Sequence, residues 1–135
     1  VLQLDICKFT TMSRDLNPLL LARMIHEIFS SFDKSVVTLQ LYKMDTIGDA
    51  YIVAGWLPDG DDWQTRDETK TTCLLVLDLA RKMISTLKRY NESRRHQLNC
   101  RIGIGIGDVA CGLLGRSQAR FHLLGDAANL AEQLE

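Results

Sequence analysis

The chain has 135 residues, the size of one domain, and its 46 % hydrophobic and 24 % charged content excludes a disordered or fibrous protein. Sixteen Lys and Arg against seventeen Asp and Glu give a net charge of −1, which argues against a generally basic, nucleic-acid-binding surface. No apolar run approaches the roughly 18 residues of a membrane span, and no basic segment precedes the first apolar stretch as in a signal peptide. We therefore expect one domain, excised from a larger protein, that itself contacts neither nucleic acid nor a membrane.

The first half of the chain predicts a helix between strands. Apolar side chains recur at helical spacing after Pro18, which suits the first turn of a helix. In chain order we expect a strand over residues 1–6, a helix with Leu21, Met24, Ile25, Ile28 and Phe32 on one face, a strand over residues 36–42, a tight turn over residues 43–49, and a strand over residues 50–55.

The second half predicts another helix, two strands and a final helix. Acidic side chains between residues 58 and 69 predict a solvent-exposed loop. We then expect a helix over residues 71–90 with Val76, Ala80, Met83, Leu87 and Tyr90 on one face, a surface turn over residues 91–97, strands over residues 101–106 and 109–114 joined by a turn at Gly107 and Asp108, and a last helix from Asp126.

This β-α-β-β-α-β order predicts an α+β fold. It is the order of a ferredoxin-like βαββαβ core, in which helices cover one face of an antiparallel sheet. The last helix is cut off at Glu135, so we expect a domain that is truncated at its C-terminus. The four cysteines, Cys7, Cys73, Cys100 and Cys111, lack the spacing of a metal site and the density of a disulfide framework, which indicates a reducing, cytosolic environment.

Two carboxylates are expected to converge in such a sheet. Asp5 ends the first strand, and Asp49 lies at the tip of the hairpin that neighbours this strand. Paired carboxylates on rigid strand ends suit hard divalent cations such as Mg²⁺, and two such ions can activate an attacking oxygen and stabilise a leaving one. On spacing alone, a helix cap at Asp5 and an ordinary turn residue at Asp49 remain the simpler interpretation.

Glycines and a polar turn add two weaker signals. Gly103, Gly105 and Gly107 alternate with isoleucine but do not form the dinucleotide-binding fingerprint, so they indicate a close approach of backbone or ligand. Phe9 and Thr10 lead into the first helix, and the free N–H groups of such a turn can hold an anion such as a triphosphate.

Three segments carry a family resemblance. They are L-D-I-C-K-F-T at residues 4–10, Y-K-M-D-T-I-G-D-A-Y at residues 42–51, and R-I-G at residues 101–103 followed by G-D-A-A-N-L-A at residues 125–131. Together they resemble the class III nucleotidyl cyclase domain, the catalytic module of adenylate and guanylate cyclases. The resemblance covers nearly the whole chain, and T-I-G-D-A-Y is its most specific part.

The resemblance implies an enzyme that converts a purine nucleoside triphosphate to the 3′,5′-cyclic monophosphate and pyrophosphate. The active site would be shared by two such domains arranged head to tail, as a homodimer or a heterodimer. The resemblance also implies that Asp5 and Asp49, with the carbonyl of Ile6, bind two Mg²⁺ or Mn²⁺ ions. The other residues expected at the site are Phe9 and Thr10 at the triphosphate, Gly48 in the hairpin turn, Arg101 at a phosphate and Asn129 at the ribose.

The base-reading positions favour GTP over ATP. Where the family has Glu for guanine or Lys for adenine, this chain has Asp45, a carboxylate that can accept from guanine N1–H and N2–H₂. The second position holds His122, which matches neither the small residue or Cys used for guanine nor the Asp used for adenine. A purely structural role for His122 is an equal alternative.

The largest departure from the family is Gln133. Four residues after Asn129 the family has an Arg that stabilises charge on the α-phosphate, and Gln cannot supply that cation. We therefore expect the metal-bearing half of a heterodimeric or tandem guanylate cyclase, in the cytosolic part of a protein that can also be membrane-bound. The alternatives are an adenylate cyclase, a homodimer with reduced activity, and a catalytically incomplete domain that serves dimerisation or regulation.

Overall fold

The computed structural model describes residues 1–117 and 120–135. Its strands pair in antiparallel fashion. The strands β1 (Leu2–Ile6), β2 (Tyr42–Ile47), β3 (Ala50–Ala54) and β4 (Cys100–Ile104) form one sheet in the order β2-β3-β1-β4. β1 is hydrogen-bonded to β3 on one side and to β4 on the other, and every pair is antiparallel. The predicted α+β fold with a βαββαβ core is confirmed.

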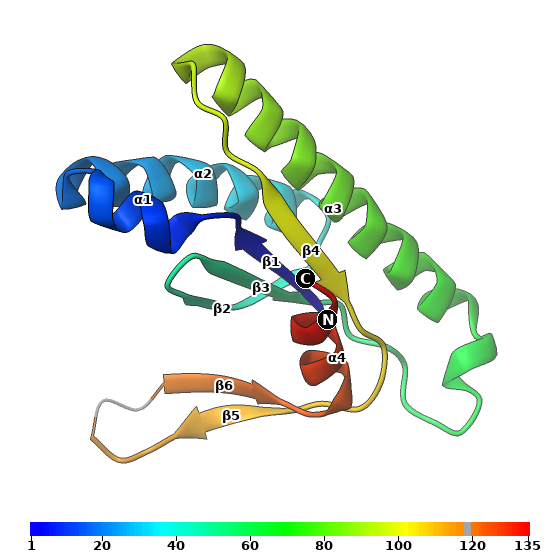
Figure 1. Cartoon of the computed structure of the whole chain (residues 1–135). Coiled ribbons are helices and arrows are strands. Elements are labelled where there is room, and N and C mark those ends of the chain that lie inside the picture. The colour runs from blue at the N-terminus through cyan, green and yellow to red at the C-terminus, as the bar shows by residue number, and fades with distance from the viewer. Residues whose placement is uncertain (118–119) are drawn as a thin grey trace.

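Two helices, α2 (Pro18–Thr38) and α3 (Asp67–Arg94), cover one face of this sheet (Figure 1). The side chain of Asn17 caps α2 by accepting from the Leu19 N–H at 2.9 Å, and Pro18 occupies the first turn. Asp67 and Glu68 in the first turn of α3 complement the helix dipole. The core lies between this helix pair and the sheet; its largest fully buried side chains are Tyr51, Phe32, Leu2, Leu4, Ile6, Ile28, Leu79, Met83 and Val53.

A further helix, α4 (Asp126–Leu134), packs on the opposite face of the sheet, against β4 and β1. Ile102 and Ile104 of β4 contact the core under α2 and α3, so the alternating glycines, Gly103 and Gly105, face the other way. A Cβ atom at Gly103 would overlap the carbonyl oxygen of Ala131, and one at Gly105 would overlap that of Ala127. The backbone that closely approaches these glycines, as predicted, is therefore that of α4. The prediction that the helices cover one face of the sheet is correct for α2 and α3, but α4 covers the other face.

The boundaries of the first hairpin differ from the prediction. The predicted strand over residues 36–42 is wrong, because α2 continues to Thr38 and buries Val36 one turn after Phe32. The predicted turn over residues 43–49 is also wrong, since Tyr42–Ile47 is β2 and only Gly48 and Asp49 form the turn. β2 is an edge strand and four of its six residues are exposed, so it carries polar residues that imitate a loop.

The remaining elements lie outside the four-stranded sheet. The predicted turn at Gly107 and Asp108 does not join paired strands: β5 (Ala110–Leu114) pairs with β6 (Arg120–Leu124), a strand that the sequence pattern did not reveal. A short helix α1 (Phe9–Asp15) precedes α2, and a 3-10 turn η1 (Trp63–Thr65) lies in the acidic loop before α3. The hairpin of β5 and β6 extends away from the body of the domain, with β6 against β2 (Figure 1).

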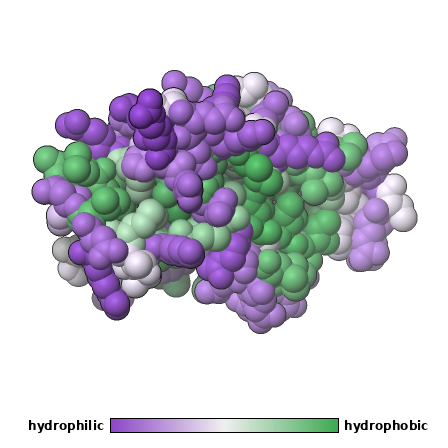
Figure 2. Space-filling model, turned by 45° about the horizontal axis from the view of Figure 1, so that its top comes forward, coloured by the Kyte–Doolittle hydropathy of each residue, from purple (hydrophilic) through white to green (hydrophobic). Residues whose placement is uncertain are grey.

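The surface is not uniformly hydrophilic. Figure 2 shows apolar side chains gathered in patches among hydrophilic ones. Large apolar side chains are exposed on β2, on the hairpin of β5 and β6, and on α4; they include Tyr42, Ile47, Leu113, Leu114, Phe121, Leu124, Leu130 and Leu134. Within the described residues, no helix has the length and apolar character needed to cross a membrane.

The contact between β4 and α4 predicts a strong response to one added methyl group. Gly103→Ala should lower the free energy of unfolding by about 2–3 kcal/mol, because the new Cβ can be accommodated only by moving α4. Gly112→Ala on β5 is the matched control, since a Cβ there meets nothing within 4 Å. Urea unfolding of both variants measures the difference, and equal stabilities would contradict the close packing of α4.

Candidate functional site

Strand pairing places Asp5 between a turn and a basic side chain. Leu4 of β1 pairs with Tyr51 of β3, so the end of β1 lies beside the turn that contains Asp49. On the other side, Asp5 is the direct partner of Arg101 on β4. Leu4 and Ile6 enter the core, so Asp5 faces away from α2 and α3, on the side of the sheet that carries α4. The structure thus brings together Asp5, Asp49 and Arg101.

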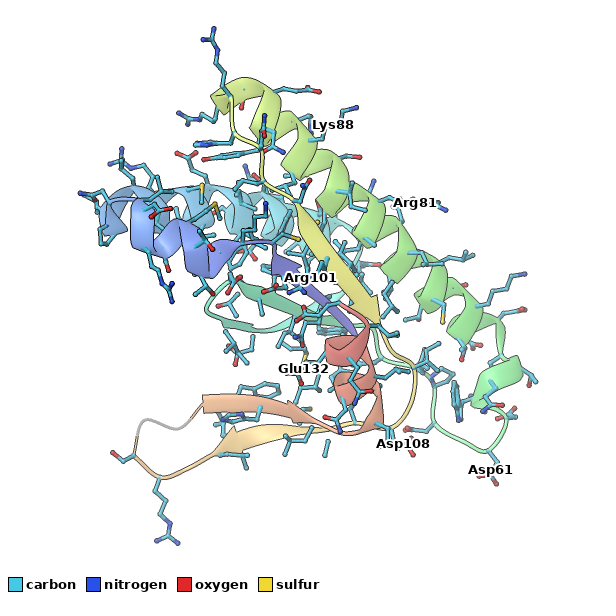
Figure 3. The ribbon with its side chains drawn as sticks, viewed as in Figure 1. Asp61, Arg81, Lys88, Arg101, Asp108 and Glu132 are labelled. Atoms are coloured by element: carbon cyan, nitrogen blue, oxygen red, sulfur yellow. The ribbon has the colours of Figure 1, made fainter. Side chains whose placement is uncertain are left out.

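Asp5 and Arg101 form an ion pair. The guanidinium Nη2 of Arg101 donates to Oδ2 of Asp5 at 2.6 Å. The Asp5 side chain is 17 % exposed and that of Arg101 is 58 % exposed, so the carboxylate is held at the sheet and the cation reaches it from solvent. This hydrogen bond raises the pKa of Arg101. In Figure 3, Arg101 projects from β4 beside α4.

Asp49 lies in an environment that disfavours its charge. Burial raises its pKa to about 6, and the hydrogen bond with Asp5 and the charge of Asp5 add to this effect. The turn that presents Asp49 depends on Gly48, which has a φ of 62° at the first position of a two-residue hairpin loop. A cation placed between Asp5 and Asp49 would compensate the repulsion of the two carboxylates.

The donor chemistry of this cluster fits Mg²⁺ or Mn²⁺. Two carboxylates supply hard oxygen ligands, and Ile6 can add only its backbone carbonyl because its side chain is a hydrocarbon. No group of three or more His, Cys, Asp or Glu side chains that could hold a metal occurs among the residues that the structure describes. Such a site leaves most of the coordination to water and phosphate oxygens, as Mg²⁺ sites in nucleotide-binding proteins do.

A third carboxylate near the cluster was missed by sequence reasoning. Burial and the charge of Asp5 raise the pKa of Glu135, and its Oε2 atom is buried without a hydrogen-bond partner in the described structure. The signal was present in the sequence, because Glu135 follows Ala127 and Ala131 at a spacing of four on the sheet-facing side of α4. Glu135 adds negative potential beside Asp5.

The predicted triphosphate turn opens α1. Lys8 precedes the helix in a left-handed conformation, with φ 61°, and the first helical bond runs from the Met12 N–H to the Lys8 carbonyl. The N–H groups of the first turn, which include those of Phe9 and Thr10, have no partner within the helix. Phe9 packs against the core, and Thr10 is exposed.

The candidate base-reading residues lie on neighbouring elements. A register shift between Lys43 and Asp45 makes Met44 a bulge residue, so Asp45 pairs with Ile52. Without the bulge Asp45 would pair with Tyr51 and lie on the face of the sheet that α2 covers. One carboxylate oxygen of Asp45 accepts from the Thr46 N–H at 2.7 Å. His122 lies on β6, the strand that lies against β2, and it pairs with Gly112 of β5. No hydrogen bond joins Asp45 to His122 within the described part of the chain.

Asn129 and Gln133 point away from the carboxylate cluster. Ala127 and Ala131 face the sheet from α4 and are buried. Asn129 lies two residues after Ala127, and Gln133 lies two residues after Ala131. This spacing places both on the opposite side of the helix, and both are exposed. One chain therefore presents the carboxylates and these two amides on different surfaces.

A polar contact anchors β2 to α2. Asp33 on α2 accepts from Lys43 Nζ at 2.8 Å and from the hydroxyl of Tyr51. Burial would raise the pKa of Asp33, but the two hydrogen bonds and the charge of Lys43 outweigh it and lower the pKa. The same burial and hydrogen bond raise the pKa of Tyr51. This contact holds the hairpin that carries Asp45 and Asp49.

Comparison with known proteins decides the family. The model of the Adenylate and Guanylate cyclase catalytic domain matches residues 1–135. The chain belongs to this family of cyclase catalytic domains. It is 34 % identical over 131 residues to Guanylate cyclase 2G of Rattus norvegicus and 33 % identical over 133 residues to Receptor-type guanylate cyclase gcy-23 of Caenorhabditis elegans. Each match covers 97 % of this chain but only 12 % of the relative.

Solved structures of cyclase domains share the fold. The guanylate cyclase domain of RhGC from Catenaria anguillulae, solved in complex with GTP, superposes with a TM-score of 0.78 at 26 % identity, covering 97 % of this chain and 68 % of that one. The adenylyl cyclase CyaB from P. aeruginosa superposes with a TM-score of 0.81 at 21 % identity, covering 98 % and 68 %. The resemblance stated from the sequence motifs is confirmed.

The contact of Asp33 predicts a pH-dependent stability of this cyclase domain. Because the pKa of Asp33 is lower in the folded chain, its contribution is present above the unfolded-state pKa and is lost as pH falls through the folded-state pKa. Asp33→Asn should lower the free energy of unfolding by about 1 kcal/mol at pH 7, a modest value because the pair is partly exposed. The difference should shrink in strongly acidic buffer.

Urea unfolding at neutral and acidic pH checks this expectation. Asp15→Asn, an exposed carboxyl at the end of α1, is the control and should be neutral at both pH values. A loss for Asp33→Asn that does not change with pH would contradict a role for the charge of Asp33.

Proposed function

We propose that this chain is the catalytic domain of a purine nucleotide cyclase. It would convert a nucleoside triphosphate, with GTP favoured over ATP, to the 3′,5′-cyclic monophosphate and pyrophosphate. The observation that carries the proposal is the convergence of Asp5 and Asp49. Burial and the neighbouring Asp5 raise the pKa of Asp49 to about 6, which creates a demand for a cation. The family supports the reaction class.

The residues of the cluster would act by binding and orientation. In the reaction the ribose 3′-oxygen loses its proton and forms a bond to the α-phosphorus, and the bond from that phosphorus to pyrophosphate breaks. Asp5 and Asp49, with the carbonyl of Ile6, would hold two Mg²⁺ or Mn²⁺ ions, which supply charge stabilisation when bound. Arg101 would move between Asp5 and a phosphate oxygen, and the N–H groups of Phe9 and Thr10 would receive the triphosphate beside Gly48.

Asp45 supports the preference for GTP. The bulge at Met44 turns Asp45 to the side of the sheet where Asp5 lies and where β6 approaches with His122. A carboxylate at this position accepts two hydrogen bonds from guanine and would repel the acceptor N1 of adenine. The guanylate cyclases among the relatives agree with this choice.

A second cyclase domain is needed to complete the proposed site. Asn129 and Gln133 are exposed on the side of α4 that faces away from Asp5. These two side chains can contact a substrate bound at a carboxylate cluster only if that cluster belongs to another domain placed head to tail. Exposed apolar side chains on α4, such as Leu130 and Leu134, and on β6, such as Phe121, supply a surface for that partner.

Gln133 makes the proposed dimer asymmetric. A homodimer would place Gln133 in both clefts, and neither cleft would have a cation at the α-phosphate. We therefore propose that this chain is the metal-bearing half of a heterodimeric or tandem cyclase, and that its partner supplies the Arg. Since receptor-type guanylate cyclases are among the relatives, we further propose that the domain is the cytosolic part of a longer, membrane-bound protein.

The metal assignment predicts a loss of nucleotide binding. Asp5→Asn or Asp49→Asn should weaken Mn²⁺-dependent binding of a non-hydrolysable GTP analogue by at least about tenfold, because an amide keeps the shape but loses the charge of the ligand. Calorimetry with and without Mn²⁺ measures this. Glu92→Gln, an exposed carboxylate near the end of α3, is the control and should leave binding unchanged. Unaltered binding in either Asp variant would rule out the two-carboxylate metal site.

The asymmetry predicts that the purified domain alone binds Mn²⁺-GTP but hardly cyclises it. The missing cation corresponds to about 3–4 kcal/mol of transition-state stabilisation, so Gln133→Arg should raise cyclase activity by about 10²–10³-fold. Gln133→Met is the neutral control of similar length. Adding a cyclase domain that carries the Arg should restore one productive cleft, and assays with GTP and ATP in parallel test the base preference.

Robust activity of the unmodified domain alone would contradict the half-site proposal and leave the homodimeric cyclase. An inactive assembly with intact nucleotide binding, even with the Arg-bearing partner present, would favour a regulatory or dimerisation module.

A further inference from the structure

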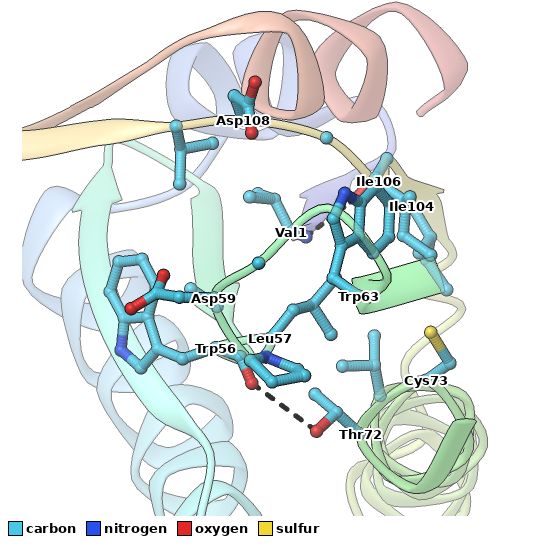
Figure 4. Close-up of a pocket in the computed structure, with 18 of the residues that line it drawn as sticks. Val1, Trp56, Leu57, Asp59, Trp63, Thr72, Cys73, Ile104, Ile106 and Asp108 are labelled. Atoms are coloured by element: carbon cyan, nitrogen blue, oxygen red, sulfur yellow. Dashed lines mark hydrogen bonds between the residues drawn. The ribbon is translucent and has the colours of Figure 1, made fainter. Parts of the chain in front are cut away.

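A cavity lies at the opposite end of the sheet from the carboxylate cluster. It has a volume of about 760 Å³ and is bordered by the start of β1, the ends of β3 and β4, and the loop that leads to α3 (Figure 4). Val1 lines this cavity, whereas Asp5 lies toward the other end of the same strand. The cavity is thus separate from the proposed cyclase site, and the cyclase motifs assign it no role.

Aromatic and aliphatic side chains form one part of the cavity wall. Both tryptophans of the chain, Trp56 and Trp63, line it, together with aliphatic side chains such as Ile104 and Val76. Figure 4 shows Trp63 over Ile104 and Ile106, with Trp56 on the other side of the loop beside Asp59. A volume of a few hundred Å³ with walls of this kind is typical of small-molecule sites.

The backbone of both tryptophans is tied to α3, and the ring of Trp56 has an aromatic neighbour. The ring of Trp56 packs against Tyr42 with centroids 6.2 Å apart, and its carbonyl accepts from the hydroxyl of Thr72 at 3.5 Å. The carbonyl of Trp63 accepts from the Thr69 hydroxyl, which belongs to a buried residue of α3. The loop that carries both tryptophans is therefore anchored before any ligand binds.

All charged side chains that line the cavity are acidic. Asp59, Asp61 and Asp108 contribute carboxylates, and no Lys, Arg or His side chain belongs to the lining. In the described part of the chain none of these three carboxylates forms an ion pair or a side-chain hydrogen bond. The backbone nitrogen of Val1 also borders the cavity and donates to the carbonyl of Gly105 at 2.8 Å.

We propose that this cavity binds an organic cation with an aromatic or aliphatic body, such as an arylalkylammonium. The apolar walls would take the body of the ligand, the indole faces would attract its cationic head, and Asp59 and Asp108 would neutralise the charge from the two facing loops. Asp59, Asp61 and Asp108 are exposed, so a neutral ligand would leave them solvated by water and would gain no attraction from them. A bare metal ion fits less well, because it needs several converging oxygen ligands and has no use for apolar walls.

Intrinsic fluorescence gives a direct test, because every tryptophan of the chain lies at the cavity. The chain is titrated with 2-phenylethylammonium and with 2-phenylethanol, its neutral counterpart, and calorimetry repeats the titration. The cation should change the tryptophan emission saturably with a dissociation constant in roughly the millimolar range or below, as expected for so small a probe. The alcohol should bind about tenfold more weakly.

Variants separate this proposal from non-specific binding. The double variant Asp59→Asn with Asp108→Asn should lose about tenfold in affinity for the cation while leaving the weak binding of the alcohol unchanged. Asp15→Asn, whose carboxyl lies outside the lining, should bind the cation as the unmodified chain does.

Two results would overturn the proposal. One is the absence of saturation by the cation in both fluorescence and calorimetry, and the other is equal affinity for cation and alcohol, which would show that the carboxylates do not select the ligand. Neither result depends on cyclase activity, so the test stands apart from the proposed function.

Discussion

β1 is hydrogen-bonded along both edges, and this central position forces its side chains to alternate between the two faces of the sheet. Leu2, Leu4 and Ile6 are at most 1 % exposed and form the floor of the core under α2 and α3. Asp5 must then face the other side, between Arg101 and the turn of the hairpin. The hydrophobic core and the carboxylate cluster are two consequences of one pairing pattern.

The cluster is unfavourable for the fold considered alone. Burial and the neighbouring Asp5 raise the pKa of Asp49 to about 6, so the ionised pair of carboxylates weakens the folded state at neutral pH. Arg101 compensates Asp5 by an ion pair at 2.6 Å from the solvent side. Groups held together at such a cost are typical of binding and catalytic sites, which supports our proposal that the cluster holds cations and phosphate.

Patterns of apolar residues predicted the helices α2, α3 and α4, the strands β1, β3 and β4 and the α+β class, because the burial of one face imposes a period on the sequence. They failed at β2, where an exposed edge strand carries the polar residues of a loop, and at the end of α2, where Val36 packs in the core although its neighbours favour a strand. β6 escaped notice, since the hairpin that it forms with β5 buries few of its side chains and has no strong period.

The sequence by itself determined the family, through motifs whose residues are adjacent along the chain, and it placed Asp5 at a strand end and Asp49 in a turn. Only the tertiary structure decided which side chains meet. The bulge at Met44 reverses the side on which Asp45 lies, and α4 packs on the glycines of β4 so that Asn129 faces outward. A register shift of one residue moves a side chain to the other face of a sheet, and such a shift depends on pairing with distant strands that no local pattern contains.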